Sequence, residues 1–146
     1  RVLFRSIPKF MFEKAEEISK IRVETLNMAL DLGVKVVMGT DAGTPYNYHG
    51  KNCMELVQYV DKGIMSPMEA IVASTGTAAE AVGLGHCTGT LQPGKAADCL
   101  VLKQDPLENI NCLLDLDCIH MIFKEGALIK GEVDTQQWNT SSPLGL

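Results

Sequence analysis

The chain has 146 residues, of which 46% are hydrophobic and 21% charged, with a net charge of -5; this composition suits a globular domain with a core. Binding to the phosphate backbone of a nucleic acid requires a concentrated basic face, and this acidic sequence shows none, so we expect no nucleic-acid partner. The sequence shows no apolar run near the roughly 20 residues of a membrane span and no secretory signal pattern, so we expect a cytoplasmic protein without a membrane partner.

The first residues are expected to form a leader followed by a helix. Residues 1–6, Arg-Val-Leu-Phe-Arg-Ser, also match the translation of a common sequencing adapter, which indicates a non-native leader. Residues 7–32 are predicted to be helical, because apolar side chains recur at steps of three and four between charged ones. These apolar residues are Phe12, Ala15, Ile18, Ile21, Met28 and Leu32.

The next segment contains the first candidate functional residue. Residues 34–38, Val-Lys-Val-Val-Met, predict a short strand buried on both faces, since the apolar residues do not alternate with polar ones. The strand leads into Asp41, which stands between Gly39 and Gly43, and glycine allows a sharp turn and a close approach to a ligand. Barrels of alternating strands and helices keep their chemistry at this strand end. The alternative is an ordinary turn aspartate.

Helices are predicted after a polar loop at residues 42–51. Asn52 is expected to cap a helix that continues through Val60. Residues 66–69, Ser-Pro-Met-Glu, predict a second helix that begins with a capping box and has proline at its first position. Residues 77–82 predict a further short helix.

The C-terminal part changes to short apolar runs between turn signals. These runs predict strands at residues 99–102, 119–123 and 128–129. The polar residues 133–146 are expected to form a loose tail. The five cysteines, an odd number without any Cys-x-x-Cys pair, are typical of a reducing compartment and of core packing rather than of a disulfide framework.

Four motifs occur in order along the chain: Gly-Thr-Asp-Ala-Gly at 39–43, Met-Ser-Pro-Met-Glu-Ala-Ile at 65–71, Gly-Thr-Leu-Gln-Pro-Gly-Lys-Ala-Ala-Asp at 89–98 and Asp-Pro-Leu at 105–107. Together they resemble the C-terminal part of the amidohydrolase superfamily. The resemblance is greatest to imidazolonepropionase-like and Xaa-Pro dipeptidase-like members, and it extends over roughly residues 15–131.

The resemblance implies an α/β fold in which this chain is a C-terminal fragment. Residues 7–87 would form the C-terminal portion of a (β/α)₈ TIM barrel, namely its last strand and flanking helices. Residues 88–132 would form part of a small β-sandwich domain. A barrel strand without its neighbours leaves unpaired edges and exposed apolar faces, so we expect the isolated chain to aggregate or to be partly unfolded.

The resemblance also implies a site. Asp41 would bind a divalent metal, with zinc expected and one or two ions in the full-length protein, and would transfer protons; a carboxylate suits both roles. A zinc site needs about four ligands, whereas the chain has no His-x-His pair and its three histidines lie elsewhere. We therefore expect the fragment alone to bind no catalytic metal.

The loop after Asp41 provides candidate substrate-binding residues, His49 and Tyr46, because loops at this face of a barrel form the pocket; an exposed loop histidine is the alternative. The implied activity is hydrolysis of a non-standard or cyclic C–N bond of amide type in a small amide or dipeptide-like substrate. Two alternatives stay open: a fragment of an Xaa-Pro dipeptidase-type peptidase, and a non-catalytic α/β association module. A homo-oligomer also stays open.

Overall fold

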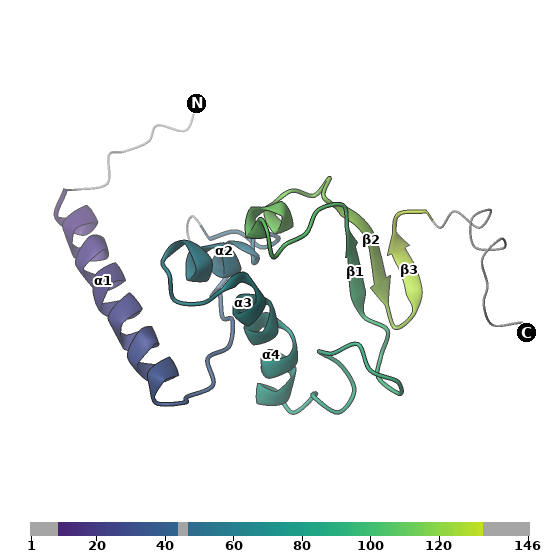
Figure 1. The fold of residues 1–146 in the computed structure, drawn as a ribbon. Helices are drawn as coiled ribbons and strands as arrows, with labels where there is room; N and C mark the ends of the chain where they lie inside the picture. Colours follow the sequence, from purple (N-terminus) through teal and green to yellow (C-terminus); the bar gives the residue numbers. More distant parts are fainter. Residues whose placement is uncertain (1–8, 44–46, 133–146) are drawn as a thin grey trace, which may run out of the picture.

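The computed structural model describes residues 9–43 and 47–132. Helices come first and a small sheet follows (Figure 1). The elements are α1 (Lys9–Asp31), α2 (Met54–Asp61), α3 (Pro67–Ser74), α4 (Gly76–Ala81), β1 (Cys99–Leu102), the 3₁₀ helix η1 (Ile110–Leu114), β2 (Ile119–Lys124) and β3 (Ala127–Lys130). Within this part, α1 and the sheet lie on opposite sides of α2, α3 and α4. The predicted leader and tail lie outside the described residues.

The long predicted helix is confirmed as α1, but much of its apolar stripe is uncovered. Ile18, Ile21 and Met28 are each more than half exposed, at 54%, 55% and 62%. Leu26 and Leu30, nearer the C-terminal end of the helix, do pack against the core. An apolar helix face normally packs against a neighbour, so only the last turns of α1 find that neighbour within the described chain.

The predicted strand at residues 34–38 is wrong for this chain. These residues form an irregular connection between α1 and the loop before α2. Val36 and Met38 are only half-buried, with one side against the core. Two hydrogen bonds connect the segment with core residues, one from the Met38 amide to the Ala73 carbonyl at 3.3 Å and one from the Tyr59 hydroxyl to the Val37 carbonyl at 3.4 Å. A strand requires a ladder of backbone bonds with another strand, and the described chain provides no such neighbour here.

The core lies between α2, α3 and η1. Its buried members are Leu56, Val57, Tyr59, Met65, Ala70, Ala73 and Ile110. The capping box of α3 is confirmed: the Ser66 hydroxyl accepts a hydrogen bond from the Glu69 amide, and the Glu69 carboxylate accepts from the Ser66 amide at 2.8 Å. The predicted cap of α2 is wrong by one residue, because Cys53 rather than Asn52 holds the N-cap position and its side chain makes no capping bond. A helical turn at Asn52, whose carbonyl accepts from the Glu55 amide, shifts the start of the helix.

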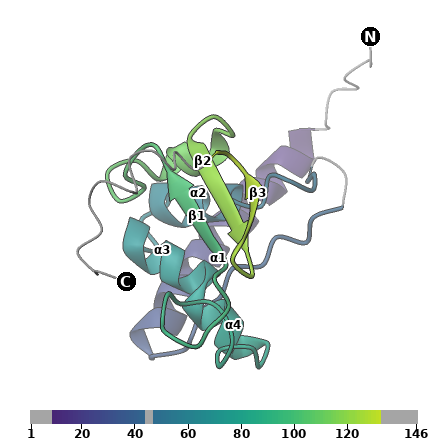
Figure 2. The same cartoon turned by 90° about the vertical axis from the view of Figure 1, so that its right-hand side faces the viewer.

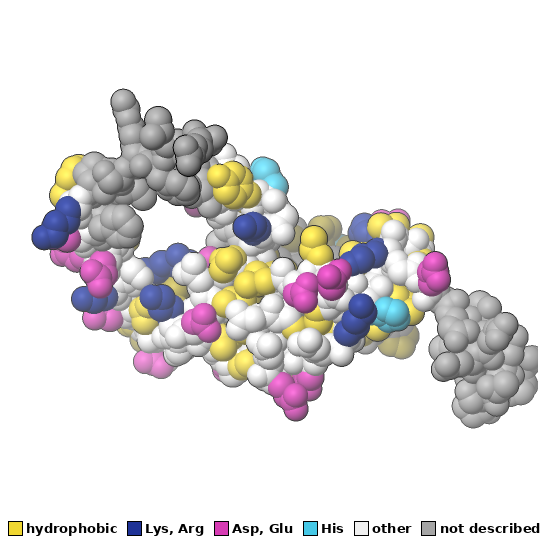
Figure 3. All heavy atoms as spheres, turned by 90° about the horizontal axis from the view of Figure 1, so that it is seen from above, with side chains coloured by type: hydrophobic (Ala, Val, Ile, Leu, Met, Phe, Trp, Pro, Cys, Tyr) yellow, Lys and Arg dark blue, Asp and Glu magenta, His cyan; other side chains and the backbone are white. Residues whose placement is uncertain are grey.

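The three predicted C-terminal strands are confirmed as an antiparallel sheet in the order β1-β2-β3. Cys99 pairs with Phe123, and Ile122 pairs with Lys130. Figure 2 shows the sheet from its outer side, with the helices behind it. Side chains of every strand remain exposed, including Leu100 and Ile129 at 51% and 64%. Figure 3 shows hydrophobic side chains at the surface over both the helices and the sheet.

Asp98 joins the connector from α4 to the hairpin of β2 and β3. Its carboxylate accepts hydrogen bonds from the Glu125 amide at 2.8 Å, the Lys124 ammonium at 3.0 Å and the Thr88 hydroxyl at 3.1 Å. These bonds hold the pKa of Asp98 below its ordinary value, with the Glu125 amide as the largest cause. Lys95 holds the same connector, since its ammonium donates to the Gly85 carbonyl at 2.7 Å and to the Thr90 hydroxyl. Both residues therefore act structurally.

Candidate active site

Asp41 follows the half-buried segment at residues 36–38 and lies in an unusual backbone conformation. Its φ is 48°, in the left-handed region that few residues other than glycine adopt. Aspartate is one of the residues that tolerate this region, so the conformation alone does not separate a turn residue from a functional one. The side chain is exposed in the described structure. Asp41 is thus presented outward at the end of a segment whose other residues contact the core.

Asn47 fixes the backbone on both sides of Asp41. Its side-chain amide donates a hydrogen bond to the Thr40 carbonyl, and its own carbonyl accepts from the Gly43 amide at 2.9 Å. The two bonds tie the loop to the residues before and after the carboxylate. Asn47 was not among the predicted site residues, because the sequence gives only a weak signal for it: one asparagine in a polar loop, where asparagine is common for local reasons.

A cavity of about 410 Å³ opens beside Asp41. Two cationic side chains line it. Arg22 of α1 forms an ion pair with Glu55 of α2. Lys51 forms no ion pair with any residue in the described ranges 9–43 and 47–132. The full lining is Arg22, Gly39, Thr40, Asp41, Asn47, Lys51, Met54, Glu55 and Gln58. Two carboxylates, Asp41 and Glu55, line the cavity beside these two cations, so the cavity suits a polar ligand.

The structure places His49 close to this site. A Cβ atom added to Gly43 would lie 3.1 Å from the His49 Nε2 atom, so the imidazole lies against the backbone two residues after Asp41. The side chain is otherwise exposed. This exposure is expected for a ligand-binding residue in a loop without its ligand, and equally for an ordinary surface histidine. Tyr46, the other predicted substrate contact, lies outside the described residues.

The described residues do not form a metal site. No group of three or more histidine, cysteine, aspartate or glutamate side chains in ranges 9–43 and 47–132 is arranged to hold an ion. Asp41 and Glu55 both line the cavity, but Glu55 is bound to Arg22. Since zinc needs about four ligands, Asp41 can be one member of a ligand set that these residues leave incomplete.

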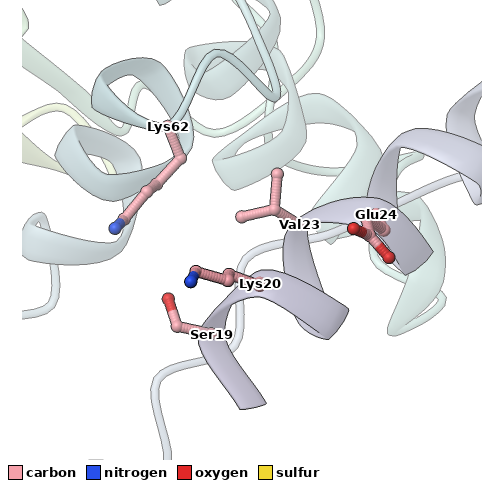
Figure 4. A pocket seen from close by; sticks show the side chains of 5 residues that line it. All are labelled: Ser19, Lys20, Val23, Glu24 and Lys62. Carbon is pink, nitrogen blue, oxygen red and sulfur yellow. The ribbon is translucent and has the colours of Figure 1, made fainter. Parts of the chain in front are cut away.

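A second, smaller hollow of about 270 Å³ lies between α1 and the end of α2. Figure 4 shows Lys20 of α1 and Lys62 after α2 extending toward the same space, with Val23 between the helices. Its lining residues are Ser19, Lys20, Val23, Glu24 and Lys62, and none of them is a predicted site residue. The cavity beside Asp41 is therefore the better candidate active site.

A comparison with known families identifies the class of protein. The profile of the amidohydrolase family matches residues 4–129, and the chain belongs to this family. Members of the family are generally metal-dependent.

Individual relatives agree with this assignment. The chain is 32% identical to ochratoxinase of Aspergillus niger over 124 residues, which are 84% of this chain and 25% of that protein. It is 31% identical to imidazolonepropionase of Thermoplasma volcanium over 100 residues, 68% of this chain and 24% of the relative. A crystal structure of a Xaa-Pro dipeptidase with bound methionine in the active site matches with a TM-score of 0.71 and 31% identity, covering 88% of this chain and 30% of that one.

Two facts follow from these relatives. They are hydrolases that act on C–N bonds, and the structural neighbours are amidohydrolase-family proteins of TIM-barrel type. The chain spans about a quarter of the length of the curated relatives it matches. No helix in the described ranges combines the length and the hydropathy that crossing a membrane requires.

Proposed function

We propose that this chain provides the C-terminal part of a metal-dependent amidohydrolase that cleaves a C–N bond of amide type. Residues 7–87 form the last part of the barrel, and residues 88–132 form part of the adjoining β-sandwich. The uncovered stripe of α1 supports this division, since Ile18 and Ile21 would pack on barrel elements outside the described chain. The single observation that supports the active site is Asp41, which the loop presents beside a polar cavity.

Asp41 performs the proton transfers in this proposal. Its carboxylate accepts a proton from the attacking water and delivers it to the departing nitrogen, which would otherwise leave as an unstable anion. The same carboxylate would contribute one oxygen ligand to a divalent metal, with zinc as the expected ion; such an ion would lower the pKa of water and polarise the carbonyl. Asn47 is a positioning residue, because it holds the backbone of Thr40 and Gly43 on either side.

The proposed substrate is a small amide or dipeptide that bears a carboxylate. Lys51 lines the cavity with Asp41 and has no anionic partner in the described chain, so it is placed to attract a carboxylate. His49, whose imidazole lies against Gly43, and Tyr46 are proposed to contact the substrate. The structural similarity to a dipeptidase favours a second candidate within the same chemistry, cleavage of an Xaa-Pro dipeptide.

The test uses the full-length protein recovered from its source and compares Asp41→Asn with Asp61→Asn. Asn keeps the size and left-handed tolerance of Asp but cannot accept the proton, so we expect kcat with an amide substrate panel to fall by about 10²-fold or more. Asp61, an exposed residue at the end of α2, undergoes the same chemical change and should leave kcat unaltered. Near-normal turnover and metal content in Asp41→Asn would refute the role of Asp41.

A further inference from the structure

The two cations that line the cavity beside Asp41 differ in whether a carboxylate neutralises them. Arg22 of α1 donates a hydrogen bond to the Glu55 carboxylate of α2 and forms an ion pair with it. Lys51 belongs to the same lining and forms no ion pair within residues 9–43 and 47–132. Glu55 therefore decides which of the two positive charges a ligand can use.

Burial of Glu55 opposes any exchange of partners in this ion pair. The Glu55 side chain is 12% exposed, whereas the Arg22 side chain is 50% exposed. A carboxylate that has lost most of its contact with water is costly to leave without a cation. Arg22 could turn to a ligand only by leaving Glu55 uncompensated, so the ion pair should persist when a ligand enters the cavity.

Both partners of the ion pair come from helices that contact the core close by. In α2, Leu56 follows Glu55 directly and Tyr59 lies one turn later, and both are only 4% exposed. In α1, Leu26 lies one turn after Arg22 and packs against the same core. Residues one turn apart lie on the same side of a helix, so the fold sets the ion pair before any ligand enters.

We propose that Glu55 is a specificity-determining residue of the candidate active site, which neutralises Arg22 and thereby selects ligands with one carboxylate over ligands with two. This inference rests on the proposed function, because it takes the cavity as the substrate site. With Glu55 charged, Lys51 is the cation left for a ligand among the described lining residues. Without that charge, Arg22 would also be available, and a second carboxylate would gain a charge-assisted hydrogen bond from its guanidinium.

The experiment measures the binding of butyrate and succinate to the full-length protein by isothermal titration calorimetry at constant ionic strength. The two acids have the same chain length and carry one and two carboxylates. Glu55→Gln removes the charge but keeps the length of the side chain and an acceptor for Arg22, so the contact between the helices is retained. We expect this variant to raise the affinity for succinate relative to butyrate by about tenfold, the size of one hydrogen bond to a charged group.

Two further variants test whether the released charge of Arg22 causes this shift. Glu80→Gln removes the same charge from the exposed ion pair with Lys35, outside the cavity lining, and should leave the ratio of the two affinities unchanged because salt screens exposed charges. Adding Arg22→Gln to Glu55→Gln should return the ratio to the wild-type value.

The proposal would be overturned by an unchanged ratio in Glu55→Gln, by an equal rise in Glu80→Gln, or by a rise that persists without Arg22. It would also be overturned if Glu55→Gln bound neither acid. Binding of the two acids requires no turnover, so a failure of the proposed hydrolase activity would leave these measurements unaffected.

Discussion

Replacement of Gly89 by alanine tests how the connector packs on the start of α4. Gly89 has φ +89°, and an added Cβ would lie 2.5 Å from the Ala79 Cβ and 2.8 Å from the Thr75 carbonyl oxygen. Gly94 in the same connector is the matched control, since its φ is +85° but no atom lies within 4 Å of an added Cβ. The two substitutions share the cost of a left-handed backbone and differ in the steric overlap.

The magnitudes follow from these two contributions. The left-handed backbone costs a residue with a Cβ about 1–2 kcal/mol, which is the whole expected effect of Gly94→Ala. Gly89→Ala adds overpacking of about 1–3 kcal/mol, because one of the overlapping atoms belongs to the backbone and cannot rotate away. Urea unfolding followed by far-UV circular dichroism measures both free energies at one low protein concentration. Equal destabilisation by the two variants would refute the packing of the connector on α4.

Other predictions concern a helix cap, a carboxylate and the exposed surface. Ser66→Ala should lower the free energy of unfolding by about 1 kcal/mol and Ser66→Thr by much less, a difference that the same urea titrations resolve. Because the pKa of Asp98 is depressed, the stabilisation by its carboxylate is present above pH 3.8, the ordinary pKa of Asp, and is lost as the pH falls through the folded-state pKa. Asp98→Asn should therefore flatten the acid side of the curve of unfolding free energy against pH. An unchanged curve would contradict the role of its hydrogen bonds. The isolated chain should self-associate in sedimentation velocity, because Ile18, Ile21 and Met28 are exposed; a monomer with one sharp thermal transition would contradict this.

The sequence predicted elements whose determinants are local. The capping box at Ser66 and Glu69 needs only residues three apart, and the structure forms it as predicted. β2 and β3 are joined by a tight turn at Glu125 and Gly126, so their pairing is local, whereas β1 reaches β2 only through a connection that contains η1. The segment at residues 34–38 depends on remote partners: its apolar composition is that of a buried strand, but strand formation needs a neighbouring backbone, and composition does not provide one.

The residues of the candidate site also divide into those with a local sequence signal and those that depend on the folded chain. Asp41 is a candidate because a lone carboxylate after an apolar run and between glycines is a local pattern, which the resemblance of the later motifs supports. Asn47 and Lys51 were not, since their importance comes from what the folded loop brings near them: the Thr40 carbonyl for Asn47 and the cavity for Lys51.

The hydrogen bonds of the loop around Asp41 indicate what the rest of the proposed enzyme would have to add to this residue. Asn47 holds the backbone of Thr40 and Gly43 through bonds made entirely within the loop, so the direction of the Asp41 backbone does not depend on the rest of a barrel. The side chain is nevertheless exposed, whereas electrostatic catalysis is strongest where water is excluded. Elements outside the described chain would therefore act on Asp41 by burying it and by adding ligands, and would not need to reorient it.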